Sequence, residues 1–271
     1  MGGELEGKVA IVTGAANGIG RAIAQVFVDE GARVVIADID DDSAAEAATS
    51  LGESAVCVHT DVSDVDSMQA SIDFARSRFG ALDVMVNNAG ISGSYRRLMQ
   101  DDLRDFQRVI AVDLFGVMVG TQRAAAAMEP GGSIVNITSI AGINPGIGYS
   151  TYRAAKAGVI HFSRSAAIEV AELGVRVNVV APGNISTAIN ASFDTPSIVR
   201  RIQPLQRLGG TRDVANAVMY LASERSAQVT GTVLPVDGGT TAGPPPVDYE
   251  AVKARSDDSP AGAGGHLERE T

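Results

Sequence analysis

The residues best suited to chemistry are a tyrosine and a lysine four positions apart, Tyr152 and Lys156. Only three of the 22 basic residues are lysines, and the other two, Lys8 and Lys253, lie near the chain ends. Residues at i and i+4 share one face of a helix, and the apolar run after Lys156 predicts a helix here. Because an ammonium beside a phenol favours the phenolate, Tyr152 is a candidate general acid and base. An ordinary exposed tyrosine–lysine pair is the alternative.

A glycine-rich turn lies near the start of the chain. The apolar run Val9–Thr13 precedes Gly14-Ala-Ala-Asn-Gly18-Ile-Gly20, and an amphipathic segment follows from Arg21. A strand, a glycine turn and a helix in this order are typical of nucleotide binding. The glycines let the backbone approach a pyrophosphate, which rests on the positive N-terminus of the helix.

The second predicted strand ends in a carboxylate that indicates which nucleotide binds. Asp38 lies 18 residues after Gly20, close to the roughly 20 residues expected for an acid that binds a ribose. A carboxylate accepts hydrogen bonds from a ribose 2′-hydroxyl and repels a 2′-phosphate. Asp40, Asp41 and Asp42 follow, and Asn17 rather than a basic residue occupies the turn. These residues favour NAD over NADP.

Taken together, the glycine turn and the Tyr152-x-x-x-Lys156 spacing resemble the short-chain dehydrogenase/reductase family in its classical form, over roughly residues 5–242. Ser139 lies 13 residues before Tyr152, as the family's catalytic serine does. The further motifs that match, in the family's order, are Asp61-Val62, Asn87-Asn-Ala-Gly90, Pro182-Gly183 with Ile185 and Thr187, and Val236-Asp-Gly-Gly239.

This resemblance implies a mechanism and a set of site residues. Hydride moves between the nicotinamide of NAD and a carbon that bears an oxygen. Tyr152 exchanges a proton with that oxygen, Ser139 hydrogen-bonds it, and Lys156 binds the nicotinamide ribose. The expected cofactor-binding residues are Gly14, Asn17, Gly18, Ile19, Gly20, Asp38, Asp61, Val62, Asn88, Ala89, Gly90, Tyr152, Lys156, Pro182, Gly183, Ile185 and Thr187.

One residue departs from the family pattern. The family has asparagine in a Val-Asn-Leu-x-Gly context, where its side chain secures a local helix distortion and its carbonyl binds a water that reaches the lysine. Here the run is Val112-Asp113-Leu114-Phe115-Gly116. Asp113 keeps the carbonyl, and its charge would hold Lys156 protonated. It is therefore a candidate catalytic residue, with a purely structural role as the alternative.

The substrate pocket is expected to be lined by residues 91–97, 140–149 and 184–207. Ser139, Ile140, Tyr152 and Phe193 are the predicted substrate contacts. Few charges lie near Ser139, which favours an uncharged, fairly apolar secondary alcohol or ketone, such as an alicyclic, terpenoid or steroid-like compound. Two alternatives stay open: a non-catalytic NAD-sensing protein, and a 3-oxoacyl thioester reductase, for which a docking patch would come from Arg96, Arg97, Arg200, Arg201 and Arg207.

The pattern of apolar runs predicts the architecture that must position these residues. Short strand-like runs occur at 9–13, 33–38, 55–59, 84–87, 133–137, 176–180 and 232–236, with amphipathic segments between them. Continuous apolar runs indicate strands covered on both faces. We expect an α/β fold: a Rossmann-type, doubly wound, seven-stranded parallel sheet with helices on both faces. Residues 1–242 would form this single domain, and 243–271 a flexible tail rich in proline and glycine.

Composition narrows the class of protein and its partners. The net charge of −10 and the lack of a basic tract argue against binding to nucleic acid or anionic membranes. No signal peptide is visible, and no apolar run approaches 18 residues, which argues against a membrane-spanning helix. Single Cys57 and three scattered histidines indicate neither a disulfide nor a metal site. We expect a cytoplasmic, metal-independent enzyme with a small-molecule substrate. Apolar residues beyond one face of the predicted helices around 101–128 and 149–172 indicate a contact between subunits, and the family resemblance implies a homotetramer, with a dimer as the alternative.

Overall fold

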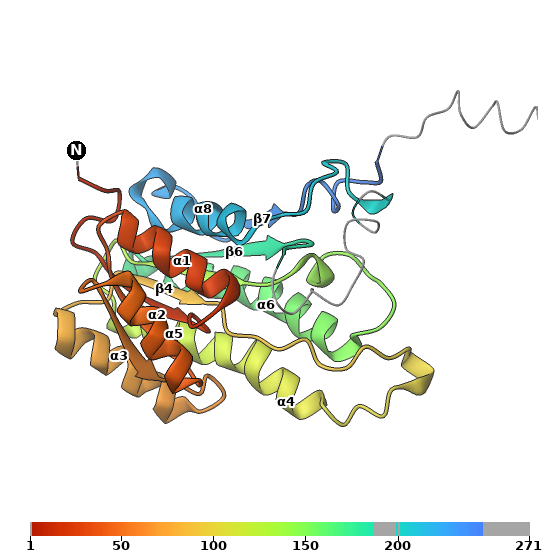
Figure 1. Ribbon diagram of the computed structural model, residues 1–271, viewed down its shortest axis with the longest axis horizontal. Helices are drawn as coiled ribbons and strands as arrows, with labels where there is room; N and C mark the ends of the chain where they lie inside the picture. Colours follow the sequence, from red (N-terminus) through yellow and green to blue (C-terminus); the bar gives the residue numbers. More distant parts are fainter. Residues whose placement is uncertain (1, 187–198, 200, 246–271) are drawn as a thin grey trace, which may run out of the picture.

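Seven parallel strands form one sheet in the part of the chain that the computed structural model describes, residues 2–186, 199 and 201–245. The strand order is β3-β2-β1-β4-β5-β6-β7, and every neighbouring pair is parallel. Strands β4, β6 and β7 of this sheet are labelled in Figure 1. The bounds are β1 Val9–Thr13, β2 Arg33–Asp38, β3 Ala55–His59, β4 Val84–Asn87, β5 Ser133–Ile137, β6 Arg176–Pro182 and β7 Val233–Val236. The predicted doubly wound sheet is confirmed, with β6 running two residues further than expected.

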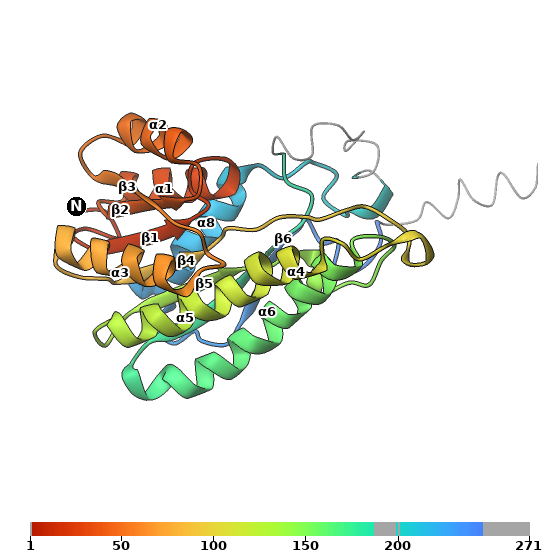
Figure 2. The ribbon, with the colours of Figure 1, turned by 90° about the horizontal axis from the view of Figure 1, so that it is seen from below.

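Helices cover both faces of the sheet. Helices α1, α2 and α8 lie on one face, where α1 packs against α8. On the other face α3, α5 and α6 lie in sequence, and α4 continues into α5 (Figure 2). Their bounds are α1 Gly18–Asp29, α2 Asp41–Leu51, α3 Val65–Phe79, α4 Phe106–Ile110, α5 Gly116–Ala127, α6 Ser150–Glu169 and α8 Thr211–Ala222. Helix α4 begins later than the predicted 101, because Leu103 has a positive φ of 53° that an α-helix does not accept.

Local signals in the sequence explain where several helices begin and end. The Asp40 and Asp64 side chains cap α2 and α3 by accepting hydrogen bonds from backbone N–H groups of the first turn. Helix α3 ends at Gly80, whose φ of 88° suits the left-handed conformation of a helix C-cap.

The core between these layers is aliphatic, as the composition predicts. Its buried hydrophobic residues are alanine, valine, isoleucine, leucine and methionine, and Phe27 is the single aromatic side chain among those described. Small β-branched side chains on both faces of the strands let the helices approach the sheet closely.

One expectation about membranes needs correction. Together with the turn between them, α4 and α5 form a continuous helix, Phe106–Ala127, that is long and apolar enough to cross a membrane by length and composition. Half of the relevant window is buried inside the protein. A core helix of a folded domain passes the same test, so this helix is weak evidence for a membrane span.

The strand order places the site. It reverses between β1 and β4, and in doubly wound sheets ligands bind at the carboxyl ends of the strands beside such a switch point. The glycine turn follows β1, Asp38 ends β2, Asn88–Gly90 follow β4, and Ser139 follows β5. The fold therefore gathers these segments at one edge of the sheet.

Candidate active site

A buried ion pair lies at the centre of this edge. The Lys156 ammonium is 3.0 Å from Asp113 Oδ2, and the two side chains are 4% and 0% exposed. The Lys156 Nζ also donates a hydrogen bond to the Ile137 carbonyl oxygen at 3.3 Å. Lys156 Nζ also lies 5.6 Å from the centre of the Tyr152 ring. The predicted proximity of the phenol and the ammonium is therefore present, with Asp113 as a third member.

Asp113 also fixes the loop that follows β4. Its Oδ1 accepts a hydrogen bond from the Ile91 backbone N–H at 2.8 Å. Residues Ala111–Phe115 form a π-helical turn between α4 and α5, which is the kind of distortion that the family resemblance implied. Gly90 lies against the pair, because a Cβ there would be 3.2 Å from both Asp113 Oδ2 and Lys156 Nζ. The absence of a side chain at Gly90 leaves room for the ion pair.

Ser139 is held against the same turn of α6. The Thr138 hydroxyl donates to the Lys156 carbonyl at 2.7 Å, which ties the end of β5 to α6. Ser139 then begins the 3₁₀ turn Ile140–Gly142 and accepts a hydrogen bond from the Ala141 N–H at 3.1 Å. A Cβ at Gly142 would lie 2.6 Å from the Lys156 carbonyl carbon. This close packing brings the segment of Ser139 to the Tyr152–Lys156 face.

Tyr149 is a second candidate for the working tyrosine, because Arg153 follows it at the same spacing as Lys156 follows Tyr152, but the Arg153 guanidinium is engaged elsewhere. Arg153, four residues on, donates from Nε to the Gly148 carbonyl at 2.9 Å and from Nη1 to the Asn144 carbonyl at 3.1 Å. Its guanidinium therefore holds residues 144–148 in place. The geometry favours Tyr152 over Tyr149 as the tyrosine that works with a cation.

The glycine turn fits the pyrophosphate of a dinucleotide. No side chain caps the N-terminus of α1, so its first backbone N–H groups are free of a side-chain acceptor. Gly18 has a φ of 58° and nothing within 4 Å of where its Cβ would be, which leaves the backbone open to a ligand. Gly20 is packed instead, because a Cβ there would lie 2.3 Å from the Gly14 carbonyl oxygen. Asn17 and Ile19 lie in this turn, as predicted.

Asp38 stands beside the glycine turn. Its Oδ2 accepts from the Ala16 N–H at 2.9 Å and its Oδ1 from the Asp40 N–H at 3.1 Å. Hydrogen bonds from Ser43, above all from its backbone N–H, hold the pKa of Asp40 below its usual range. The end of β2 is therefore acidic where the adenosine ribose of a dinucleotide would lie.

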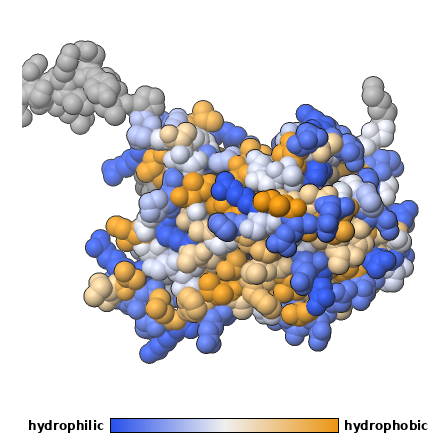
Figure 3. Space-filling model, turned by 180° about the vertical axis from the view of Figure 1, so that it is seen from behind, coloured by the Kyte–Doolittle hydropathy of each residue, from blue (hydrophilic) through white to orange (hydrophobic). Residues whose placement is uncertain are grey.

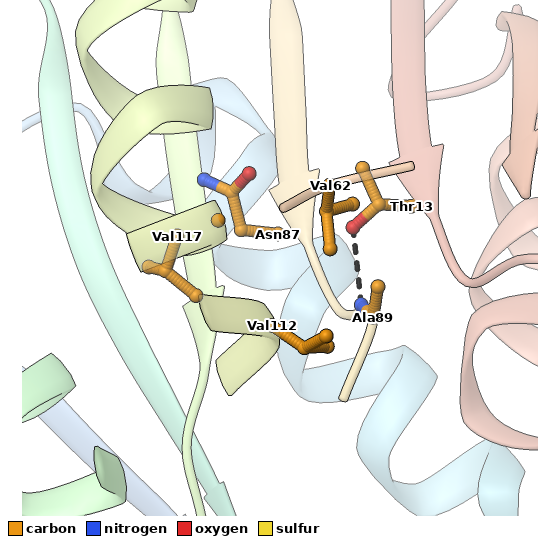
Figure 4. Close-up of a pocket in the computed structure, with 7 residues that line it drawn as sticks. Thr13, Val62, Asn87, Ala89, Val112 and Val117 are labelled. Atoms are coloured by element: carbon orange, nitrogen blue, oxygen red, sulfur yellow. Dashed lines mark hydrogen bonds between the residues drawn. The ribbon is translucent and has the colours of Figure 1, made fainter. Parts of the chain in front are cut away.

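Thr13 links the glycine turn to the loop after β4. Its hydroxyl oxygen accepts hydrogen bonds from the Asn88 N–H at 2.9 Å and the Ala89 N–H at 3.0 Å. The Asn88 amide donates to the Thr13 carbonyl at 2.8 Å. Behind this loop lies a small pocket, into which Thr13, Ala89 and the π-helical turn face (Figure 4). The two cofactor-binding segments thus form one hydrogen-bonded unit.

The remaining predicted cofactor residues lie around this unit. Asp61 accepts hydrogen bonds from Ser63, and Val62 is buried. The Gly183 N–H donates to the Val236 carbonyl at 3.0 Å, just past Pro182 at the end of β6. Thr187 lies outside the described residues, as does the predicted substrate contact Phe193.

The expected pocket wall is partly corrected. Ile185 was expected to line the pocket, but its side chain is 3% exposed and belongs to the core. Ile143 and Ile147 are exposed on the loop after β5, and Ile140 is half-buried. Tyr95 lies in the segment 91–97 that was expected to line the pocket, and its ring centre is 5.1 Å from that of Tyr149.

Two arginines of the suggested docking patch have partners within the chain. Both guanidinium nitrogens of Arg207 are 2.8 Å from the Asp213 carboxylate, and this lowers the pKa of Asp213 to about 2. Arg96 pairs with Asp102 at 3.1 Å. Arg200 lies outside the described residues. These pairings reduce the positive charge that the patch offers to an acidic partner.

Comparisons with known proteins agree with this geometry. Residues 14–241 match the family model described as "Enoyl-(Acyl carrier protein) reductase". The chain is 43% identical over 248 residues to cis-4-hydroxycyclohexanecarboxylate dehydrogenase of Sinomonas cyclohexanicum, covering 89% of this chain and all of that protein. It is 39% identical over 248 residues to momilactone A synthase of Oryza sativa subsp. japonica, covering 87% and 90% of the two chains. The solved structure of levodione reductase matches with a TM-score of 0.84 and 29% identity, over 88% of this chain and 99% of that one.

The chain belongs to the short-chain dehydrogenase/reductase family. It is therefore an oxidoreductase whose family uses nicotinamide cofactors and interconverts alcohols and carbonyl compounds.

Removing one partner of the buried ion pair should be far more harmful than removing both. Asp113→Leu leaves the Lys156 ammonium uncompensated, and we expect the free energy of unfolding to fall by about 3–5 kcal/mol. Asp113→Leu combined with Lys156→Met should recover most of this loss, with about 1–2 kcal/mol remaining for the unpaired Ile91 N–H. Urea unfolding at a fixed protein concentration gives the free energy of unfolding of the parent, the single variant and the double variant.

The control is the exposed pair of Asp29 with Arg212, 3.4 Å apart. Asp29→Ala should change the free energy of unfolding by less than about 1 kcal/mol. A loss in Asp113→Leu no larger than this would contradict the description of a buried, mutually dependent pair.

Proposed function

We propose that this protein transfers hydride between NAD(H) and an uncharged, fairly apolar secondary alcohol or its ketone, with alicyclic compounds as the preferred class. The observation that carries this proposal is the buried Lys156 beside the Tyr152 ring, held by Asp113 beneath the loop that follows β4. A protein that only binds a nucleotide needs the glycine turn and Asp38 but has no use for this arrangement.

Each side chain has a separate task in the proposed reaction. Tyr152 takes the hydroxyl proton when the alcohol is oxidised and returns it to the oxygen when the ketone is reduced. Ser139 hydrogen-bonds the same oxygen, and it begins a 3₁₀ turn that packs against α6, the helix that carries Tyr152. Proton transfer of this kind contributes about 10²–10⁴ to a rate.

Lys156 and Asp113 have positioning roles around Tyr152. The Lys156 ammonium lies 5.6 Å from the centre of the Tyr152 ring and would bind the nicotinamide ribose. Asp113 keeps the ammonium in place and, through the Ile91 N–H, positions the loop on which the cofactor would rest. When bound, the nicotinamide cofactor accepts or delivers the hydride, and the protein supplies position and electrostatics.

The acidic end of β2 supports NAD rather than NADP. Asp38 lies next to the glycine turn, and Asp40 is held in its ionised form by Ser43. A 2′-phosphate would bring two further negative charges to this place without a described cation beside it.

Two observations support an alicyclic substrate. Exposed isoleucines, Ile143 and Ile147, follow the segment of Ser139 and offer an apolar surface. The relative from Sinomonas cyclohexanicum is named for a hydroxylated cyclohexane ring. That compound also carries a carboxylate, so cyclohexanone with and without a 4-carboxylate distinguishes an uncharged substrate from an acidic one.

A thioester reductase remains the second candidate, because the description of the matched family model names an acyl carrier protein as part of the substrate. Arg96 and Arg207, which would recognise such an acidic carrier, are already paired with Asp102 and Asp213. Turnover of a 3-oxoacyl thioester in preference to cyclic ketones would favour this candidate.

Replacing Tyr152 by Phe should abolish turnover and leave cofactor binding nearly unchanged. The phenylalanine ring keeps the packing but has no proton to exchange. The assay follows NADH absorbance with a panel of secondary alcohols and ketones, and NADH fluorescence gives the dissociation constant. We expect a loss of at least 10³-fold in kcat and a change below threefold in Kd. If no compound of a broad panel is turned over while NADH binds tightly, the protein is a sensor rather than an enzyme.

The cofactor preference should depend on Asp38. The parent should bind NADH at least tenfold more tightly than NADPH, and Asp38→Ser should narrow this ratio because the repelling carboxylate is gone. Glu53→Ser, an exposed acidic residue in the turn between α2 and β3, is the matched control. Equal or tighter binding of NADPH by the parent would overturn the assignment to NAD.

We also propose that the protein assembles as a homotetramer. The long helix Phe106–Ala127 buries Val109 and Val117 but leaves Phe115 and Met118 each 40% exposed, and Ile168 of α6 is 80% exposed. Apolar side chains beyond one helical face indicate a second contact surface. Hydrophobic residues also interrupt the hydrophilic surface seen from behind (Figure 3).

Light scattering at micromolar concentration should therefore give a mass close to four times 27.9 kDa. Phe115→Asp together with Met118→Asp should lower the mass, because two charges would be buried at the contact. A parent protein of monomeric mass would contradict the assembly.

A further inference from the structure

Three tyrosine rings lie in a row that begins at the proposed proton donor. The Tyr152 and Tyr149 ring centres are 6.3 Å apart in an edge-on arrangement, and those of Tyr149 and Tyr95 are 5.1 Å apart with planes tilted by 54°. Tyr149 and Tyr152 belong to the start of α6, whereas Tyr95 comes from the segment after β4. Two loops that follow neighbouring strands thus bring aromatic side chains to one place.

The backbone of Tyr149 is strained in a way that keeps its ring there. Its φ of 54° and ψ of 40° are left-handed, a conformation that is unfavourable for a bulky residue. Gly148 before it also has a positive φ, of 73°. Arg153 holds this double turn through hydrogen bonds to the Gly148 and Asn144 carbonyls. A glycine or asparagine at position 149 would relieve the strain, so the ring has a use that the turn alone does not explain.

Tyr95 completes the row from the other loop. A Cβ at Gly148 would lie 2.5 Å from the Tyr95 ring, so the ring packs directly on the glycine backbone. The Tyr95 side chain remains on the surface, with the residue 60% exposed. An exposed aromatic ring packed against a glycine offers a flat, apolar surface to a ligand.

A small pocket lies between these loops and opens beside Tyr152. The residues that line it are Ser92, Gly93, Ser94, Asp101, Asp105, Tyr149, Ser150, Thr151 and Tyr152. The carboxylates of Asp105 and Asp101 already accept hydrogen bonds, from the Ser94 N–H at 2.6 Å and the Leu103 N–H at 3.0 Å. Its lining residues include two carboxylates and no basic side chain, so the pocket disfavours an anionic ligand.

We propose that Tyr95 and Tyr149 form an aromatic subsite that holds the ring of a cyclic substrate next to Tyr152. This inference rests on the proposed oxidoreduction of an alicyclic alcohol or ketone. The C–H groups of a saturated ring pack on the faces of the two tyrosines, while the carbonyl oxygen reaches Tyr152 and Ser139. An open-chain ketone of equal carbon number gains less from this surface, because it must lose internal rotations to lie against it.

The test compares a cyclic with an acyclic ketone in variants that remove one ring at a time. Cyclohexanone and hexan-2-one are assayed with NADH for the parent, Tyr149→Leu, Tyr149→Phe and Tyr95→Ala. Tyr149→Leu and Tyr95→Ala should each raise KM for cyclohexanone at least tenfold, with less than a threefold change in kcat. KM for hexan-2-one and the Kd of NADH should change less than threefold. Tyr149→Phe keeps the ring and should match the parent.

Two controls separate this subsite from general damage. Tyr220→Leu removes a partly exposed tyrosine from α8, outside the proposed site, and should leave both KM values unchanged. Tyr95 is largely exposed, so Tyr95→Ala should fold even if Tyr149→Leu does not. Equal losses for both ketones, or no loss in either ring variant, would overturn the subsite while the proposed function stands. A parent that reduces no ketone would overturn both.

Discussion

The Lys156–Asp113 ion pair is the interaction on which the arrangement of this site depends. Neither charge is exposed, so each needs the other, and the elements that carry them cannot move apart independently. Lys156 belongs to α6, Asp113 to the π-helical turn between α4 and α5, and the Ile91 N–H connects the loop after β4. This one ion pair thus fixes the helix that carries Tyr152, the loop after β4 and the π-helical turn relative to one another.

Strain and burial are concentrated around this pair. Asp113 lies in a π-helical turn, and Tyr149 adopts a left-handed backbone at the start of α6. The Arg153 hydrogen bonds hold the turn at Tyr149, and the Asp113 side chain ties the π-helical turn to Lys156 and to the Ile91 N–H. Strained backbone of this kind is typical of functional sites. Its cost in folding free energy is offset by regular packing in the rest of the fold.

The sequence predicted those features that depend on local patterns. Short stretches of residues were enough to predict all seven strands, the glycine turn, Asp38 and the Tyr152–Lys156 spacing. The periodicity or spacing of each stretch is typical of one local structure. Asp113 stood out because it departs from a family pattern, but its contacts with Lys156 and Ile91 depend on how two distant helices pack. Tyr95 falls in the stretch 91–97 expected to line the pocket, and Arg153 lies four residues after Tyr149, but their contacts arise from loop conformations that local patterns do not determine. The apolar length of Phe106–Ala127 was missed, since single charges at Arg108, Asp113 and Arg123 interrupt the run without preventing a long helix.

The central claim is that Asp113 positions Lys156 and the cofactor loop, and that its carboxylate does not itself move protons. The most direct test is the pH dependence of turnover for the parent and Asp113→Asn. The asparagine side chain still has an oxygen that can accept the hydrogen bond from the Ile91 N–H, and the backbone carbonyl at position 113 is unchanged. Asparagine is also the residue usual in the family. We expect Asp113→Asn to fold and to have turnover rates within roughly tenfold of the parent, which is about 1.4 kcal/mol in the activation barrier. A loss of a thousandfold or more across the pH range would contradict it and place the carboxylate in the chemical step.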